Sequence, residues 1–220
     1  MNPYLSASVM EFSPLLHGLH QNDLRLAFHP DHWHDLNVKS GISSEMIRRA
    51  YLFSVRPCDL SRILGWNPEQ VHSALAFPYP GTELIRLKVF PPFKDQEGRS
   101  VKYLQRKGTS PHIYLPPGIG PAISDPRCPL AIVEGEKKCL RAAQEGLASI
   151  GIGGIWCWKH KGQPLPDFDA VEWRKREVTI YPDGDAWTKV EIKRGTYELG
   201  QELKRRGASV DVAVLSGVTV

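Results

Sequence analysis

The sequence predicts an α/β fold: an open parallel four-stranded sheet with flanking helices, preceded by a small helical segment and a basic β-rich segment. Beyond residue 129, short apolar runs alternate with helical patterns, which indicates a parallel sheet covered on both faces. Upstream, apolar and basic residues alternate as in half-buried strands. The first part of the chain shows only short helical patterns. We therefore expect an N-terminal extension with short helices at 1–75, a basic β-rich segment with a Pro- and Gly-rich connector at 76–128, and the parallel α/β domain at 129–220.

The composition is that of a folded protein with a mild positive charge. The chain has 220 residues, 28 Lys and Arg against 24 Asp and Glu, and 41% hydrophobic side chains. This length suits one large domain, or one domain with a smaller attachment, and the apolar share excludes wholesale disorder. The net charge of +4 permits an anionic partner without requiring one.

The four cysteines, Cys58, Cys128, Cys139 and Cys157, are widely separated. No two have the short spacing of a zinc ribbon, so we expect no zinc and no disulfide framework. The N-terminus lacks the basic and apolar regions of a signal peptide. No apolar run approaches the ~18–20 residues of a membrane span. We therefore expect a cytoplasmic protein that makes no contact with a membrane.

Three histidines, His29, His32 and His34, lie close together in the sequence. Their number could indicate a metal site. Pro30 and the shifting spacing argue against a rigid helix or strand that would present three ligands. We interpret these histidines as structural or solvent-exposed.

Local patterns predict the elements of the first half. Helical spacing with a Ser43 or Ser44 cap predicts a short helix at about 43–52, and a second follows at 59–64. Alternation predicts strands at 84–90, 101–106 and 112–115. The stretch 116–129 is rich in Pro and Gly and is the strongest candidate for a domain boundary.

Basic side chains outnumber acidic ones over these predicted strands. If their polar faces align, they form a cationic platform for phosphate backbones. The alternative is an ordinary solvated sheet face on which Lys and Arg extend into water, and both interpretations stay open. The candidate nucleic-acid-binding residues of this platform are Arg86, Lys88, Lys102, Arg106 and Lys107.

Beyond the connector, strands and helices alternate. A hairpin of 178–181 with 187–192 is the alternative to the last predicted helix. A capping box of Thr188 and Glu191 favours the helix, although Gly195 and Gly200 cost it about 1 kcal/mol each. The seven elements are predicted at 130–133, 136–145, 148–152, 167–175, 178–181, 188–206 and 210–215.

Acidic residues follow two of these strands: Glu134 and Glu136 the first, and Asp183 and Asp185 the third. Ligands of an open parallel sheet bind beyond the carboxyl ends of the strands. The two clusters converge there if the first and third strands are neighbours and the second lies outside. Crowded carboxylates need cations between them, and hard oxygen ligands favour Mg²⁺ or Mn²⁺. Such a site suits phosphate esters, because metal ions clamp the attacking and leaving oxygens.

Basic and aromatic groups flank these acids. Lys137 and Lys138 fall at a helix N-terminus, where backbone N–H groups favour phosphate. They could hold a nucleoside triphosphate or simply neutralise the adjacent glutamates. After the second strand, base stacking competes with core packing as the interpretation of Trp156, Trp158, Lys159, His160 and Lys161.

These motifs resemble the TOPRIM domain, which is shared by bacterial-type primases, topoisomerases of types IA and II, and some nucleases. The resemblance covers about residues 40–215 and points to the primase-like proteins of phages, plasmids and mobile elements. The motifs that show the resemblance occur in the expected order of elements. They are Lys-Tyr-Leu at 102–104, Ile-Val-Glu-Gly-Glu-Lys-Lys at 132–138, Ile-Gly-Gly-Ile-Trp at 152–156 and Asp-Gly-Asp at 183–185.

The resemblance implies a TOPRIM-like catalytic domain at 129–220 and assigns roles within it. Glu134 matches the family's strand-end glutamate, a metal ligand or general acid–base group. Asp183 and Asp185 match the pair that coordinates Mg²⁺, and Glu136 would be an outer partner of the metal. Nucleotide phosphates would contact Lys137, Lys138, Gly153 and Gly154, and nucleic acid would also contact Lys159 and Lys161.

The first hypothesis is therefore a primase-type nucleotidyltransferase, dependent on Mg²⁺ or Mn²⁺, that makes oligonucleotides from nucleoside triphosphates on single-stranded DNA in plasmid or mobile-element replication. A helicase or another replication protein would be its partner. The alternatives are a metal-dependent nuclease at the same carboxylates and a non-catalytic module that binds nucleic acid or recruits replication proteins. No zinc module precedes the core and no P-loop is present. The abrupt end after the last predicted strand indicates a piece of a longer replication protein.

Overall fold

The computed structural model describes residues 24–184 and 189–213. The chain divides into two compact units, Met1–Thr109 and Ser110–Val220. The sequence places its boundaries at 75/76 and 128/129, whereas this division falls within the predicted β-rich segment. Within the described residues, no helix is long and apolar enough to cross a membrane.

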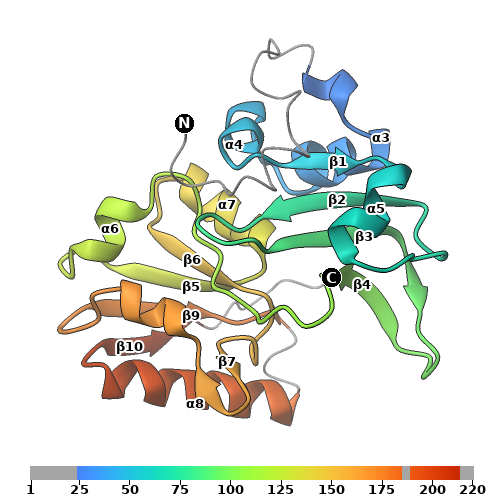
Figure 1. The fold of residues 1–220 in the computed structure, drawn as a ribbon. Coiled ribbons are helices and arrows are strands. Elements are labelled where there is room, and N and C mark those ends of the chain that lie inside the picture. Colours follow the sequence, from blue (N-terminus) through green and yellow to red (C-terminus); the bar gives the residue numbers. More distant parts are fainter. Residues whose placement is uncertain (1–23, 185–188, 214–220) are drawn as a thin grey trace. The chain divides into compact units, whose positions relative to one another are not determined.

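The first unit contains an antiparallel four-stranded sheet with the order β1-β2-β3-β4 (Figure 1). Its strands are β1 (Phe53–Val55), β2 (Ser73–Pro78), β3 (Ile85–Lys94) and β4 (Ser100–Leu104). The predicted strands at 84–90 and 101–106 are confirmed as β3 and β4. The sequence patterns did not predict β1 and β2.

Short helices complete this unit. Ser43 caps α4 by accepting the Met46 N–H at 3.1 Å, as predicted, but this helix ends earlier than expected because Tyr51 adopts a left-handed φ of 54°. Helix α5 ends at Gly65 with a φ of 75°, which confirms the second predicted helix. The helical elements are η1 (Arg25–Ala27), α3 (Pro30–Trp33), the π-helical turn η2 (His34–Lys39), α4 (Ser44–Arg49), η3 (Pro57–Asp59) and α5 (Leu60–Leu64).

His32 is a core residue of the first unit. Its side chain is fully buried, and its ring nitrogens lie 2.8 Å from Ser54 Oγ and 3.2 Å from Ser73 Oγ. Its ring also packs on Phe90. No group of three or more potential metal ligands occurs in the described part of the chain. The burial of His32 and its hydrogen bonds to two serine side chains confirm the structural interpretation for this histidine.

We expect acid to destabilise the first unit through His32. Burial is the main cause that lowers the His32 pKa from 6.5 to about 4. A histidine pKa that is lower in the folded state stabilises the fold above the unfolded pKa, and this contribution is lost as the pH falls toward the folded pKa. Between pH 7 and pH 4 the loss is about 3 kcal/mol. Hydrogen exchange of the β2 and β3 amides measures it, and His32→Gln should remove this part of the pH dependence. An unchanged pH dependence in His32→Gln would show that other groups cause the loss.

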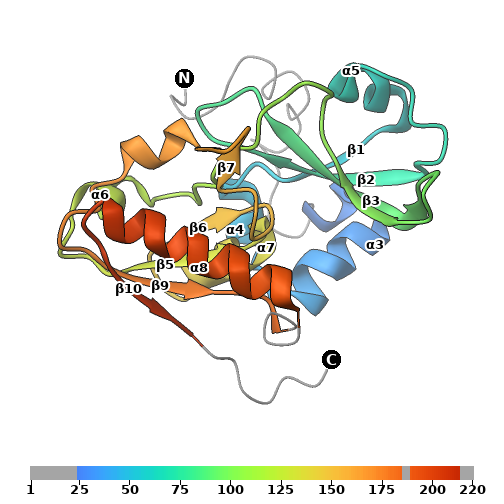
Figure 2. The same cartoon turned by 90° about the horizontal axis from the view of Figure 1, so that it is seen from below.

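The second unit contains the predicted parallel sheet, with the order β10-β9-β5-β6. Strands β5 and β9 are neighbours and β6 lies outside, which is the arrangement that brings the acidic clusters together. Helix α7 (Glu136–Gln144) and helix α8 (Val190–Arg205) lie on opposite faces of the sheet (Figures 1 and 2). The strands are β5 (Leu130–Glu134), β6 (Ser149–Ile152), β9 (Glu177–Tyr181) and β10 (Ser209–Val212).

Two predicted elements of this unit were wrong. The stretch 112–115 is not a strand of the β-rich segment: Tyr114 forms an isolated antiparallel bridge with Gly151 of β6. The stretch 167–175 contains only the 3-10 helix η4 (Pro166–Ala170). Val171 and Trp173 are buried on either side of an exposed residue, which is the alternation of an extended chain rather than of a helix. The connector also holds α6 (Gly120–Ser124), and a small hairpin is formed by β7 (Lys159–His160) and β8 (Gln163–Pro164).

Helix α8 confirms the helical prediction over the hairpin. Thr188 lies outside the described residues, so the expected cap at this position is not described. Leu199 and Leu203 are fully buried in the core on this face of the sheet. The core also contains Trp158, with 4% of its surface exposed, as the core-packing interpretation predicts.

The two glycines of α8 should respond in opposite directions to replacement by alanine. A Cβ atom on Gly195 would lie 3.0 Å from Trp156 Cε2 and 3.1 Å from Ile155 Cγ2, whereas on Gly200 the nearest atom is 3.8 Å away. Alanine gains about 1 kcal/mol of helix propensity at either position, but overpacking costs about 1–3 kcal/mol. We therefore expect Gly200→Ala to stabilise the chain and Gly195→Ala to destabilise it by about 1 kcal/mol in chemical denaturation. Equal effects at both positions would contradict this packing.

Candidate active site

Glu134 ends β5 and connects the carboxyl ends of three strands. It pairs with Ile152 of β6, and its Oε1 accepts the backbone N–H of Asp183, just after β9, at 2.9 Å. The carboxylate also accepts the N–H of Ile155, in the turn after β6. Parallel pairing of β5 with both neighbours therefore brings the two predicted acidic positions together.

The surroundings of the Glu134 carboxylate disfavour its ionised form. Burial is the main cause that raises its pKa, and the neighbouring Asp183 charge raises it further. The backbone N–H groups and the Lys138 ammonium oppose this rise. Additional positive charge at this point would favour the ionised carboxylate.

Asp183 is half exposed, and its carboxylate accepts a hydrogen bond from the Lys138 ammonium. Glu136 differs from both acids: it begins α7 with 1% of its surface exposed and interacts electrostatically with the buried Tyr114 and Cys139. Burial raises the pKa of Cys139 to about 12 and that of Tyr114 well above its usual value. Both groups therefore stay neutral, and Cys139 is no nucleophile.

The predicted phosphate-contacting residues surround this edge. Lys137 is half-buried and Lys138 exposed in the first turn of α7. Gly153 and Gly154 form the turn after β6, and Gly154 O accepts the Cys157 N–H at 2.8 Å. Backbone amides at such turns and helix starts can face a phosphate without interference from side chains.

The acids that the structure describes could contribute to a divalent metal site. Asp185 lies outside the described residues. Among the described residues, no group of three or more His, Cys, Asp or Glu side chains lies close enough to hold a metal ion. Glu134 and Asp183 supply hard oxygen donors, which fit Mg²⁺ or Mn²⁺. The ammonium of Lys138 already places a cation against one of them.

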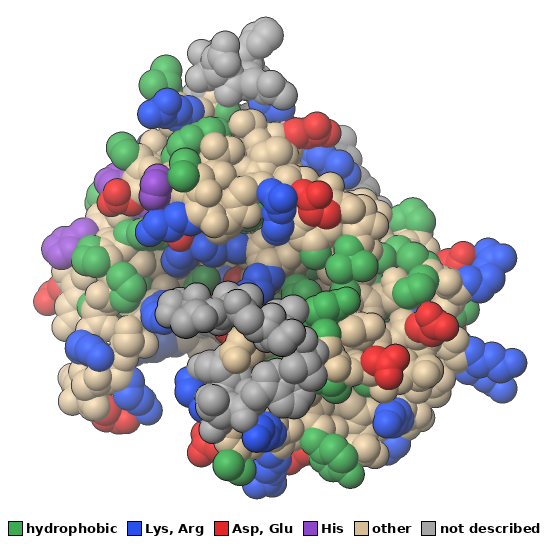
Figure 3. Space-filling view, turned by 180° about the vertical axis from the view of Figure 1, so that it is seen from behind, with side chains coloured by type: hydrophobic (Ala, Val, Ile, Leu, Met, Phe, Trp, Pro, Cys, Tyr) green, Lys and Arg blue, Asp and Glu red, His purple; other side chains and the backbone are tan. Residues whose placement is uncertain are grey.

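Some residues of the predicted basic platform in the first unit make contacts within the protein instead of extending into solvent. Lys88 forms a buried ion pair with Asp35 at 2.7 Å, the two side chains being 16% and 9% exposed. Arg106 donates to the carbonyls of Arg62 at 2.8 Å and Ile63 at 3.3 Å. Basic and acidic side chains are interspersed over the face in Figure 3. The remaining candidates are Arg86, stacked on Tyr103, Lys107, over the Trp66 ring, and Lys102, which is exposed.

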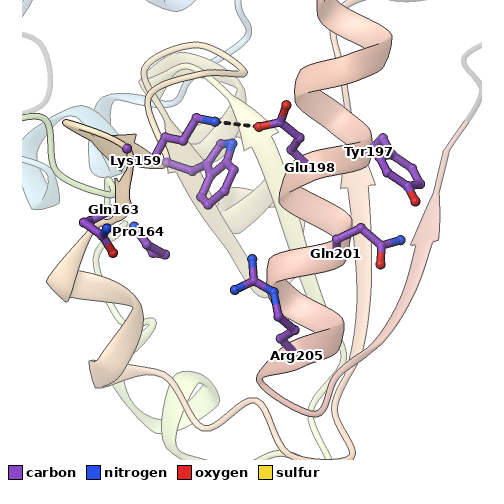
Figure 4. A pocket seen from close by; sticks show the side chains of 9 residues that line it. Lys159, Gln163, Pro164, Tyr197, Glu198, Gln201 and Arg205 are labelled. Atoms are coloured by element: carbon purple, nitrogen blue, oxygen red, sulfur yellow. Dashed lines mark hydrogen bonds and ion pairs between the residues drawn. The ribbon is translucent and has the colours of Figure 1, made fainter.

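Lys159 lies in a separate pocket of about 400 Å³ between the β7–β8 hairpin and α8. Its ammonium bonds Glu198 at 2.5 Å (Figure 4) and lies over the rings of Trp156 and Trp158. Lys161, in the hairpin turn, is exposed. Of Lys159 and Lys161, the two predicted nucleic-acid contacts of this unit, only Lys161 is therefore exposed to solvent.

Sequence patterns missed two further polar residues, His112 and Asp167. Nδ1 of His112 lies 3.0 Å from both carboxylate oxygens of Asp167. The partners are 55 positions apart, so no local spacing links them. The only signal was His112 itself, a titratable residue next to an apolar run.

Comparisons with known proteins support this fold. A family model described as a domain of unknown function (DUF3854) matches residues 122–219. No curated protein matches. Among solved structures, a DnaG primase catalytic domain bound to single-stranded DNA is similar with a TM-score of 0.55 at 17% identity, over 96% of this chain and 74% of that one. The Escherichia coli primase catalytic core gives 0.51 at 17% identity, over 96% and 73%. The Aquifex aeolicus primase gives 0.50 at 12% identity, over 91% and 57%. The chain therefore shares the fold of DnaG primase catalytic cores.

Proposed function

We propose that this chain is a divalent-metal-dependent phosphoryl-transfer domain that synthesises oligonucleotides on single-stranded DNA, as a primase does. The observation that carries the proposal is the contact of the Glu134 carboxylate with the Asp183 N–H at 2.9 Å. Two acids 49 positions apart meet at the edge where ligands of a parallel sheet bind. An ordinary fold has no need for half-buried like charges at this place.

Glu134, Asp183 and Asp185 would hold Mg²⁺ or Mn²⁺. When bound, such an ion lowers the pKa of an attacking hydroxyl and neutralises charge on the phosphates. The two backbone N–H groups keep the Glu134 carboxylate in a fixed orientation. Fixed charges at a reacting centre need no reorganisation during the reaction, which is the main source of catalysis in phosphoryl transfer.

Positive groups at the same edge would hold the nucleotide. Lys137, Lys138 and the N-terminal N–H groups of α7 favour phosphate, and the turn at Gly153 and Gly154 lets phosphates approach the backbone. The likeness to a primase domain bound to single-stranded DNA supports DNA as the template. A role in plasmid or mobile-element replication in the cytoplasm, with a helicase or another replication protein as partner, belongs to the same proposal.

The test is a synthesis assay with labelled nucleoside triphosphates on single-stranded DNA, with Mg²⁺ or Mn²⁺. Wild type should produce short labelled products that are lost in Asp183→Asn/Asp185→Asn. Shortening of the template without synthesis would contradict the proposal and indicate a nuclease. DNA binding without either reaction would replace it by a non-catalytic module.

A further inference from the structure

The pair of His112 and Asp167 lies outside the acidic site. Asp167 holds the imidazole through both carboxylate oxygens, and its Oδ2 also accepts the Ile113 N–H at 2.8 Å. The side chains of His112 and Asp167 are 32% and 22% exposed. The imidazole is therefore fixed in orientation and still accessible to a ligand.

The bridge to β6 places this pair at the carboxyl edge of the sheet. Tyr114 and Gly151 exchange both backbone hydrogen bonds, at 2.7 and 2.9 Å, in the antiparallel sense. The chain therefore runs from Tyr114 back to His112 in the direction in which β6 proceeds to Gly153. His112 lies toward the same edge as Glu134, on the opposite side of β6.

The distance across this edge matches an extended polyphosphate. Glu134 is on β5, one strand away from β6, and the segment of His112 is one strand beyond β6. Two strand spacings amount to about 10 Å between the backbones. The turn at Gly153 and Gly154 follows the strand between them and has no side chain to obstruct a ligand.

We propose that His112, oriented by Asp167, forms a subsite for the terminal phosphates of a nucleoside triphosphate whose reacting phosphate lies at Glu134 and Asp183. This subsite rests on the proposed function. A protonated imidazole donates from both ring nitrogens. Nδ1 donates to Asp167, which leaves the Nε2 N–H for a phosphate oxygen, and such charge-assisted hydrogen bonds are strong. Asp167 is a positioning residue that acts through His112.

Calorimetry with the full chain, Mg²⁺, and either ATP or AMP tests this subsite. His112→Gln should weaken ATP binding about tenfold and leave AMP binding within about twofold, because AMP lacks the terminal phosphates. The exposed His72 of the first unit supplies a control, and His72→Gln should change neither affinity. Equal weakening for ATP and AMP, unchanged ATP affinity, or no ATP binding by wild type would each overturn the subsite.

A double-mutant cycle tests the positioning role. Asp167→Asn keeps an oxygen that can accept the Ile113 N–H, so we expect the thermal midpoint to be retained. It should weaken ATP binding severalfold alone and have no further effect in His112→Gln. Additive losses would contradict action through His112. If wild type synthesises oligonucleotides and His112→Gln binds ATP with unchanged affinity, the subsite is contradicted and the proposed function stands. If ATP binding depends on His112 but no synthesis occurs, the proposed function is contradicted and the subsite stands.

Discussion

Glu134→Gln is expected to reduce oligonucleotide synthesis by roughly 100- to 10,000-fold, the range for loss of a positioned acid–base group. The glutamine amide oxygen can still accept the N–H groups of Asp183 and Ile155, so the ends of the strands stay connected. The change removes only the negative charge that a metal ion or a proton in transfer requires. Steady-state incorporation of labelled nucleotide measures this loss.

A matched control separates the loss of charge from a general effect. Glu177 begins β9, at the opposite end of the strand, and is exposed. Glu177→Gln removes the same charge from the same sheet and should retain the full rate. Comparable activity of Glu134→Gln and Glu177→Gln would exclude Glu134 from the chemistry.

Arg176→Met is expected to destabilise the second unit by about 3–5 kcal/mol. The Arg176 side chain is fully buried, and its guanidinium donates to four backbone carbonyls at 2.6–2.9 Å. Methionine leaves these buried acceptors without their donors, and each loss costs about 1–3 kcal/mol before relaxation. The acceptors are the carbonyls of Ala122, Ile123, Cys128 and Glu172.

Chemical denaturation with far-UV circular dichroism measures the effect. Arg127→Met is the control, because the Arg127 side chain is 89% exposed and pairs with Asp125. It should change the free energy of unfolding by no more than about 0.5 kcal/mol. Equal stability of Arg176→Met and Arg127→Met would mean that the buried guanidinium contributes nothing to the fold.

Much of the parallel α/β unit was predictable from the sequence because its signals are local. Apolar runs followed by glycine mark β5 and β6. Glu134 is the last residue of β5, and Asp183 lies two residues after the end of β9. The order β10-β9-β5-β6 then brings these acids together, and only this order had to be assumed in the prediction from sequence. The helix after Asp183 was also predictable, because its apolar face recurs with helical period.

The features that the sequence did not reveal depend on distant partners or full burial. Lys88 has the alternating pattern of a solvated strand face, but its partner Asp35 lies 53 positions away. The pairing of His112 with Asp167 spans a similar separation. Strand β2 is buried at all but its first residue, so it lacks the period-two pattern that identifies a half-exposed strand. The stretch 167–175 was mistaken for a helix because its buried residues come from two different conformations, Phe168 from the 3-10 helix η4 and Val171 and Trp173 from the extended chain after it.

Homopolymer templates test whether synthesis at Glu134 and Asp183 is directed by the template. Wild type with Mn²⁺ would receive oligo(dT) or oligo(dC), each with labelled ATP or labelled GTP. We predict incorporation of ATP only on oligo(dT) and of GTP only on oligo(dC), and neither in Glu134→Gln. Incorporation that ignores the template, or that persists in Glu134→Gln, would contradict this prediction.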